Sequence, residues 1–237
     1  MIALQRASLP PAVVTELTRL TSRIPHGDSD TARKLWRSSR DTRRFIRDRL
    51  GLMAAGRGYC MYCGDGLGTS VDHFEPIARN PRRAFDWLNH LLACEFCNSH
   101  FKRDRFPLDA DGHPLLIDPT AEDPLDHLFL VISLGTYLPQ TEKGRTTIAV
   151  CGLNRPLLER GRAAAVDQVA ALIFRWRTGV PETRDRAVWT LRDQPHADVL
   201  QAMLRQASMP GASRVFGDNE LLDLLRDEEL RRALATW

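Results

Sequence analysis

Two pairs of cysteines in this sequence have the spacing that holds a metal ion. Cys60 and Cys63 form one Cys-x-x-Cys pair, and Cys94 and Cys97 form the other. Thiolates three positions apart on a tight turn converge on one point, and two such pairs complete a tetrahedral zinc site. The sequence therefore predicts a structural Zn²⁺ site closed around the intervening 30 residues, 64–93.

The intervening segment contains an Asp-His pair, Asp72 and His73. An imidazole can accept a proton near neutral pH, so His73 is a candidate general base. Adjacent side chains of a strand point to opposite faces, so Asp72 is expected to do a different job unless the strand twists or ends there.

The local pattern predicts the elements that position these residues. Residues 69–74 and 89–93 are expected to form strands, a loop rich in proline and arginine separates them, and about 94–103 should be a helix. The result is strand–loop–strand–helix, with the cysteine pairs at its mouth and at the start of its helix.

The order Cys-x-x-Cys, Asp-His-Phe-x-Pro, Trp-x-Asn, Cys-x-x-Cys-Asn-x-x-x-Lys resembles the HNH endonucleases, the ββα-metal nuclease family. The match covers about 48 residues within 58–107. Its residues are Cys60, Cys63, Asp72, His73, Pro76, Trp87, Asn89, Cys94, Cys97, Asn98 and Lys102. Shorter motifs elsewhere, among them LLIDP, TTIAVCGLN and LLERGR, resemble the HNH nuclease subunit of Septu anti-phage systems and related retron-associated effectors.

The HNH resemblance implies a role for each polar residue of the motif. His73 would be the general base, and Asp72 and Asn98 would bind a catalytic Mg²⁺ or Mn²⁺. Asn89 would tie down the loop and so orient the base. Asn98 stands where many relatives have histidine, and its amide oxygen suits a hard cation. Lys102, one helical turn after Asn98, would contact a phosphate, with a structural surface lysine as the alternative.

Other polar side chains nearby have weaker claims to the site. For His90, His100, His113 and Glu75 a role outside catalysis is favoured. The fifth cysteine, Cys151, is expected to be a small buried hydrophobe.

Positive charge is concentrated before the cysteine module. Residues 1–58 contain 12 Lys and Arg against 5 Asp and Glu, whereas the rest of the chain is slightly acidic. Helices are expected over 10–24 and 31–54, and the exposed face of the second would carry basic residues that bind nucleic acid, namely Arg37, Arg40, Arg44 and Arg47. A merely solvated helix face is the alternative. DNA is the expected ligand, and RNA stays an open alternative.

The composition and local pattern of the sequence divide the chain into four segments. They are a basic helical region (1–57), the HNH module (58–107), an extension of turns and short strands (108–155) and a helical region for partner docking (156–237). Strands are expected at 128–134 and 146–153, and helices at 156–177, 183–192, 196–207 and 218–234. The predicted fold class is α+β, mostly helical, with a ββα-metal core and a four-cysteine zinc clamp.

Composition narrows the setting. With 43% hydrophobic and 27% charged residues, the chain has the make-up of a soluble globular protein. The sequence shows neither a long apolar run nor a secretory signal, and its cysteine usage suits a reducing compartment, so a cytoplasmic location is expected and a membrane location is not.

The function expected from these features is a nuclease effector of bacterial anti-phage defence. The resemblance implies an ABC/SMC-like ATPase as partner, joined in retrons by a reverse transcriptase and its noncoding RNA. The chain has no G-x-x-x-x-G-K-[ST] motif, so ATP binding would come from another chain. A standalone restriction or homing enzyme, and a catalytically silent zinc-stabilised nucleic-acid-binding scaffold, are the alternatives.

Overall fold

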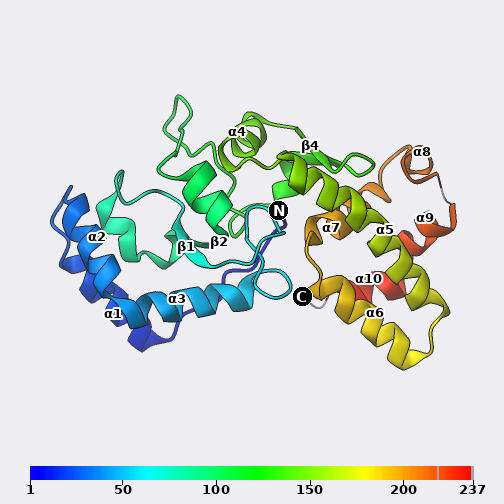
Figure 1. Ribbon diagram of the computed structural model, residues 1–237, viewed down its shortest axis with the longest axis horizontal. Helices are drawn as coiled ribbons and strands as arrows, with labels where there is room; N and C mark the ends of the chain where they lie inside the picture. Colours follow the sequence, from blue (N-terminus) through cyan, green and yellow to red (C-terminus); the bar gives the residue numbers. More distant parts are fainter. Residues whose placement is uncertain (218, 236–237) are drawn as a thin grey trace.

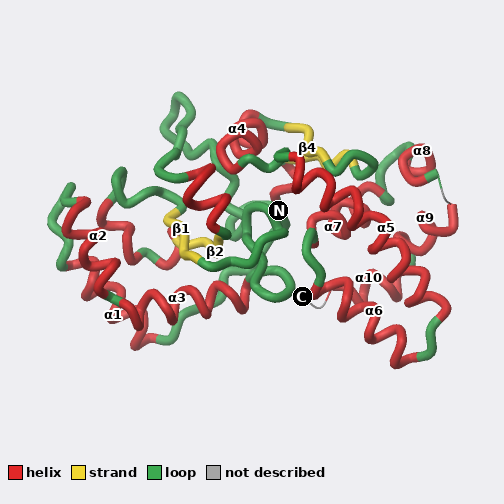
Figure 2. The backbone as a smooth tube through the Cα atoms, viewed as in Figure 1, coloured by secondary structure: helices red, strands yellow, loops and turns green. Residues whose placement is uncertain are grey.

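The computed structural model describes residues 1–217 and 219–235. These residues form a mostly helical α+β structure with two small antiparallel hairpins (Figure 2). The N-terminal helices and the first hairpin lie on one side, and the C-terminal helices lie on the other (Figure 1). The expected fold class is therefore confirmed.

The N-terminal region contains three helices where two were predicted. They are α1 (Pro11–Ser22), α2 (Ser29–Ser38) and α3 (Arg40–Met53). The predicted helix 31–54 is interrupted at Ser39. The Ser38 and Ser39 hydroxyls both donate to the Leu35 carbonyl, at 3.0 and 2.8 Å respectively. Serine hydroxyls that bond nearby carbonyls compete with helical hydrogen bonding. The break turns the helix axis between α2 and α3 (Figure 1).

The cysteine module has the predicted strand–loop–strand–helix order. Strand β1 (Ser70–His73) pairs antiparallel with β2 (His90–Ala93), and His73 lies opposite His90. The loop between them contains two short helices, η1 (Pro81–Phe85) and η2 (Trp87–Asn89). The helix after β2 is η3 (Phe96–Lys102), which is wound as a π-helix. These elements agree with the expected ranges to within two residues.

The extension after the module corrects one prediction. Its elements are η4 (Pro124–Asp126), β3 (Leu128–Val131), β4 (Thr136–Pro139) and α4 (Glu142–Cys151). The strand expected at 146–153 is wrong, because residues 146–151 belong to α4 and Gly152 follows its end. Thr141 caps the start of α4, because its hydroxyl oxygen accepts a hydrogen bond from the Gly144 N–H. Gly152, in the left-handed conformation, ends the helix. These end signals outweigh the β-branched residues within.

The C-terminal region consists of α5 (Pro156–Thr178), α6 (Pro181–Asp193), α7 (Ala197–Gln206), α8 (Ala212–Phe216), α9 (Asn219–Arg226) and α10 (Glu228–Ala235). The first three confirm predicted helices. In place of the single helix expected over 218–234, the structure has two helices, α9 and α10, divided at Asp227. The Asp227 carboxylate accepts a hydrogen bond from Leu230 N at 3.0 Å. Residue 218 lies outside the described residues. Within residues 1–217 and 219–235, none of the helices has the length and hydrophobicity of a membrane-spanning segment.

A buried polar cluster joins distant parts of the chain. The Asp198 carboxylate on α7 accepts from Arg162 of α5 at 3.2 Å, from Tyr137 of β4 at 2.5 Å and from the Met1 amino group at 2.9 Å. Arg162 and Asp198 have almost no exposed surface. The hydrophobic core around this cluster includes residues of all four sequence segments. The predicted segment borders themselves stay predictions.

Candidate functional site

The four cysteines of the two pairs form one buried cluster. Cys60, Cys63, Cys94 and Cys97 have their sulfur atoms within 4.8 Å of one another. This arrangement is consistent with a zinc site of four thiolates. The Cys151 sulfur does not belong to this cluster, and burial raises the pKa of its thiol to about 12. It is therefore an inert buried side chain, as expected.

Tight turns bring the cysteine pairs together. In the first pair, Gly64 has a positive φ of 70° and its N–H donates to the Cys60 carbonyl at 2.8 Å. A Cβ at position 66 would lie 3.0 Å from Cys94 Cβ, a tight contact that a glycine avoids. Hydrogen bonds within the cluster lower the pKa of the Cys63 thiol, whereas burial and neighbouring thiols raise the pKa of Cys60.

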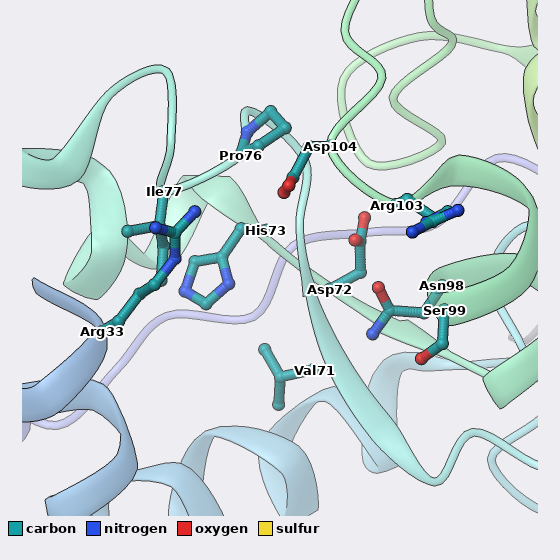
Figure 3. Close-up of a pocket in the computed structure, with 10 residues that line it drawn as sticks. All are labelled: Arg33, Val71, Asp72, His73, Pro76, Ile77, Asn98, Ser99, Arg103 and Asp104. Carbon is teal, nitrogen blue, oxygen red and sulfur yellow. The ribbon is translucent and has the colours of Figure 1, made fainter. Parts of the chain in front are cut away.

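A cavity of about 270 Å³ opens beside the first hairpin (Figure 3). Its walls come from α2, β1, the loop after β1, η3 and the turn that follows η3. The lining residues are Arg33, Val71, Asp72, His73, Pro76, Ile77, Asn98, Ser99, Arg103 and Asp104. Three predicted site residues, Asp72, His73 and Asn98, therefore share one cavity, whereas Asn89 and Lys102 do not line it.

His73 has one ring nitrogen, Nδ1, that makes no hydrogen bond to the described residues. Its Nε2 lies 3.0 Å from the Ala84 carbonyl oxygen, and the Trp36 ring packs edge-on against the imidazole with centroids 4.5 Å apart. Because a carbonyl can only accept, Nε2 carries the proton and Nδ1 keeps a free lone pair. Burial lowers the pKa of His73 to about 4, so the ring is neutral at pH 7 and can accept a proton.

Asp72 is buried at the cavity wall and held by two donors. Its carboxylate accepts from the Tyr62 hydroxyl at 2.6 Å and from Lys102 Nζ at 3.1 Å. Burial raises the pKa of Asp72, and the Lys102 ammonium opposes that change. The side chains of Asp72 and His73 extend to different sides of β1, as strand geometry predicts (Figure 3).

The position of Lys102 corrects the expectation for that residue. Lys102 is fully buried, and its Nζ also donates to the His73 carbonyl at 2.8 Å. It is neither a surface lysine nor placed to touch a phosphate. Instead, its ammonium connects the Asp72 side chain with the His73 backbone.

Asn98 offers its amide oxygen to the cavity. Its Nδ2 donates to Ser70 Oγ at 3.0 Å, and the Ser70 hydroxyl donates in turn to the Ala93 carbonyl at 3.0 Å. Because the Ser70 proton is used there, its oxygen must accept from Asn98, which fixes the orientation of the amide. The amide oxygen lies beside the Asp72 carboxylate (Figure 3).

Asn89 lies beneath the loop rather than in the cavity. It is fully buried, and its Oδ1 accepts from Glu75 N at 2.7 Å. Its Nδ2 donates to the Glu75 carbonyl at 2.9 Å and to the Arg83 carbonyl at 3.1 Å. The side chain thus connects the end of β1 with η1, the helix whose Ala84 carbonyl holds His73.

Sequence reasoning missed two charged residues of the cavity. Arg33 on α2 extends its guanidinium along the wall next to His73, and Asp104 points its carboxylate inward from the turn after η3 (Figure 3). The preceding residue, Arg103, has a φ of 52°, a conformation rare for residues other than glycine. Neither Arg33 nor Asp104 belongs to a motif, so the sequence carries no signal for them.

The predicted nucleic-acid-binding arginines are exposed but lie outside the cavity wall. Arg44 lies 3.5 Å from Asp41, and Arg47 lies 3.1 Å from Asp48. Surface ion pairs of this kind are weak and leave the guanidinium accessible. The role of Arg37, Arg40, Arg44 and Arg47 stays a prediction.

Comparison with known proteins gives a distant relative. The chain is similar to the Septu protein PtuB of Bacillus mycoides (strain KBAB4), with 27% identity over 142 residues, covering 47% of this chain and 48% of that protein. The chain therefore spans about half the length of the curated relative it matches. No protein-family profile matches the chain. The similarity supports the expected likeness to Septu proteins, whereas the HNH assignment rests on the motif.

Proposed function

We propose that this chain is a metal-dependent endonuclease of the HNH type that hydrolyses phosphodiester bonds. The observation that carries the proposal is that His73, Asp72 and Asn98 line one cavity. Asp72 and His73 come from β1, and Asn98 comes from η3, the helix that also carries Cys97. A proton acceptor and two oxygen donors that line one cavity are the minimum that metal-assisted hydrolysis requires.

The oxygen donors fit a hard divalent cation. Asp72 would supply a carboxylate oxygen and Asn98 its amide oxygen, and hard cations prefer such ligands. Bound there, Mg²⁺ or Mn²⁺ would polarise a non-bridging phosphate oxygen and stabilise the leaving alkoxide. The Lys102 ammonium offsets part of the negative charge of Asp72. The Asp104 carboxylate, which also lines the cavity, would add the negative charge that a bound cation needs.

The protein groups act on water and on the phosphate. His73 takes the proton of the attacking water at Nδ1, while the Ala84 carbonyl holds Nε2–H and fixes the ring. Asn89 keeps that carbonyl in place through its bonds to Glu75 and Arg83. Arg33, next to His73, is suited to bind a phosphate oxygen.

The biological setting of the proposal is anti-phage defence in a Septu-like complex. The similarity to PtuB supports it, and an ATPase subunit would supply the nucleotide binding for which this sequence has no motif. DNA is the proposed substrate. The exposed arginines on α2 and α3, Arg37, Arg40, Arg44 and Arg47, would bind its backbone, which makes affinity fall with rising salt.

A cleavage assay tests the proposal. Supercoiled plasmid and single-stranded RNA are each incubated with the purified protein, with and without its ATPase partner, in Mg²⁺, Mn²⁺ or EDTA. The wild type should cut with either metal and not in EDTA. His73→Ala should lose cutting, whereas His113→Ala, a control in an exposed turn, should retain it. Equal cutting by wild type and His73→Ala would refute the assignment.

One observation favours a second candidate, a silent nucleic-acid-binding scaffold. Asp72 already has two donors, Tyr62 and Lys102, and so has fewer lone pairs left for a metal. If the chain were such a scaffold, the wild type and the His73→Ala variant would bind nucleic acid with equal affinity. Neither would yield product in any metal, even with the partner present.

A further inference from the structure

An arginine from outside the cysteine module reaches the metal cluster. Arg155 directly precedes α5, and its Nη1 and Nη2 lie 3.6 and 3.8 Å from Cys97 Sγ. Its Nη1 also donates to the Cys151 and Gly152 carbonyls, at 3.4 and 3.2 Å. The guanidinium therefore bridges one thiol of the cluster and the end of α4.

Aromatic packing holds this guanidinium in place. It lies over the Phe101 ring at 5.4 Å and near the Phe96 ring at 6.0 Å, both on η3. Phe101 also packs so closely on Gly152 that a Cβ at position 152 would collide with its ring. A planar guanidinium confined in this way keeps its N–H groups directed at the sulfur with little further loss of freedom.

The positive charge of Arg155 can stabilise the four-cysteine cluster. Four thiolates around one divalent ion leave a net negative charge in a buried place, and burial of an uncompensated charge is costly. The Arg155 N–H groups already point at Cys97 Sγ and place a positive charge next to that sulfur.

We propose that Arg155 tunes the four-cysteine metal centre by donating to the Cys97 thiolate. The contact offsets negative charge on the Cys97 sulfur when a metal is bound and lowers the reactivity of that sulfur toward electrophiles. It also couples metal binding to the docking of α5 on the module. The inference concerns the structural metal and does not depend on the nuclease proposal.

Variants of the zinc-loaded protein test this role. Arg155→Gln removes the charge, Arg155→Lys keeps it without the fork of donors, and Arg105→Gln is the matched control. Arg105 donates to the Val150 carbonyl at the same junction between η3 and α4 and contacts no sulfur in the described part of the chain. Zinc transfer to a chromophoric chelator and the sulfur-to-metal charge-transfer band of the Co²⁺-substituted protein are measured, together with the melting temperature.

Arg155→Gln should lose zinc affinity by about 10- to 100-fold, the usual effect of removing a group that hydrogen-bonds a metal ligand. Its charge-transfer band should shift, Arg155→Lys should recover part of both effects, and Arg105→Gln should match the wild type. A merely structural arginine would lower the melting temperature with an unchanged band. The proposal is overturned if Arg155→Gln keeps wild-type affinity and spectrum, or if Arg105→Gln loses as much zinc. If Arg155→Gln does not fold, a wild-type spectrum and affinity in Arg155→Lys overturns it as well.

Discussion

His73 and His90 direct their Nε2 atoms to the same backbone oxygen, that of Ala84, each at 3.0 Å. The two rings lie 5.1 Å apart, and Trp36 packs on both. One carbonyl of η1 therefore fixes both imidazoles, one facing the cavity and one fully buried beneath it. The buried His90 ring packs edge-on against the half-buried His73 ring.

The shared carbonyl predicts that His90 matters although it does not line the cavity. His90→Ala removes a hydrogen bond and leaves a void beside His73 and Trp36, so stability should fall by about 2 kcal/mol. Cleavage should fall by about tenfold or more, because the base is no longer held in position. Urea unfolding and the cleavage assay measure the two effects. His100→Ala, on the exposed face of η3, serves as control, and matching values for the two variants would contradict the prediction.

The buried Lys102–Asp72 pair predicts a strong coupling. Lys102→Met leaves the Asp72 carboxylate buried without its cation, which should cost about 3–5 kcal/mol of unfolding free energy. Combining it with Asp72→Asn removes both charges, so the double variant should be less destabilised than the sum of the single variants.

Denaturant titration of the wild type, both single variants and the double variant measures this coupling. Lys34→Met on the exposed face of α2 should change stability by less than about 0.5 kcal/mol. Strict additivity of the two substitutions would show that the ammonium and the carboxylate do not depend on each other.

Much of the cysteine module was predictable because its signals are local. Paired cysteines, the Asp-His pair and alternation within short strands fix β1, β2 and the metal cluster. By contrast, the strand expected at 146–153 failed because its β-branched residues resemble a strand, whereas the cap at Thr141 and the stop at Gly152 decide for a helix.

What could not be predicted depends on contacts between distant segments. Lys102 looked like a surface lysine until η3 packed against β1 and enclosed its ammonium next to Asp72. Arg33 reaches the cavity only because α2 lies against the loop that carries η1. The hydroxyl of Tyr62, within the first cysteine pair, proved to be a donor to Asp72. Spacing along the chain contains none of this information.

The buried Asp198 predicts a dependence of stability on pH. Burial alone would raise its pKa, but the Met1 amino group and Arg162 outweigh this, and the pKa lies below the ordinary value. A carboxyl group with a depressed folded-state pKa stabilises the fold above its unfolded pKa of about 3.9 and loses that contribution as the pH falls through the folded value.

Asp198→Asn should therefore cost about 3 kcal/mol or more at pH 7, because Arg162 loses its buried anion. The stability gap between wild type and variant should narrow only below about pH 4. Urea unfolding at several pH values measures the gap, with Asp111→Asn in an exposed loop as control. A gap that is constant from pH 7 to pH 3 would mean that the carboxylate charge contributes nothing.

The most direct test of the proposed site is anomalous diffraction from crystals of the protein soaked in Mn²⁺. The account predicts a zinc peak among the four cysteine sulfurs and a separate manganese peak in the cavity, about 2.1–2.3 Å from oxygens of Asp72 and Asn98. His73 should lie beside that ion without binding it. A cavity that stays free of manganese while the zinc peak is present, or a manganese peak that avoids both Asp72 and Asn98, would contradict the account.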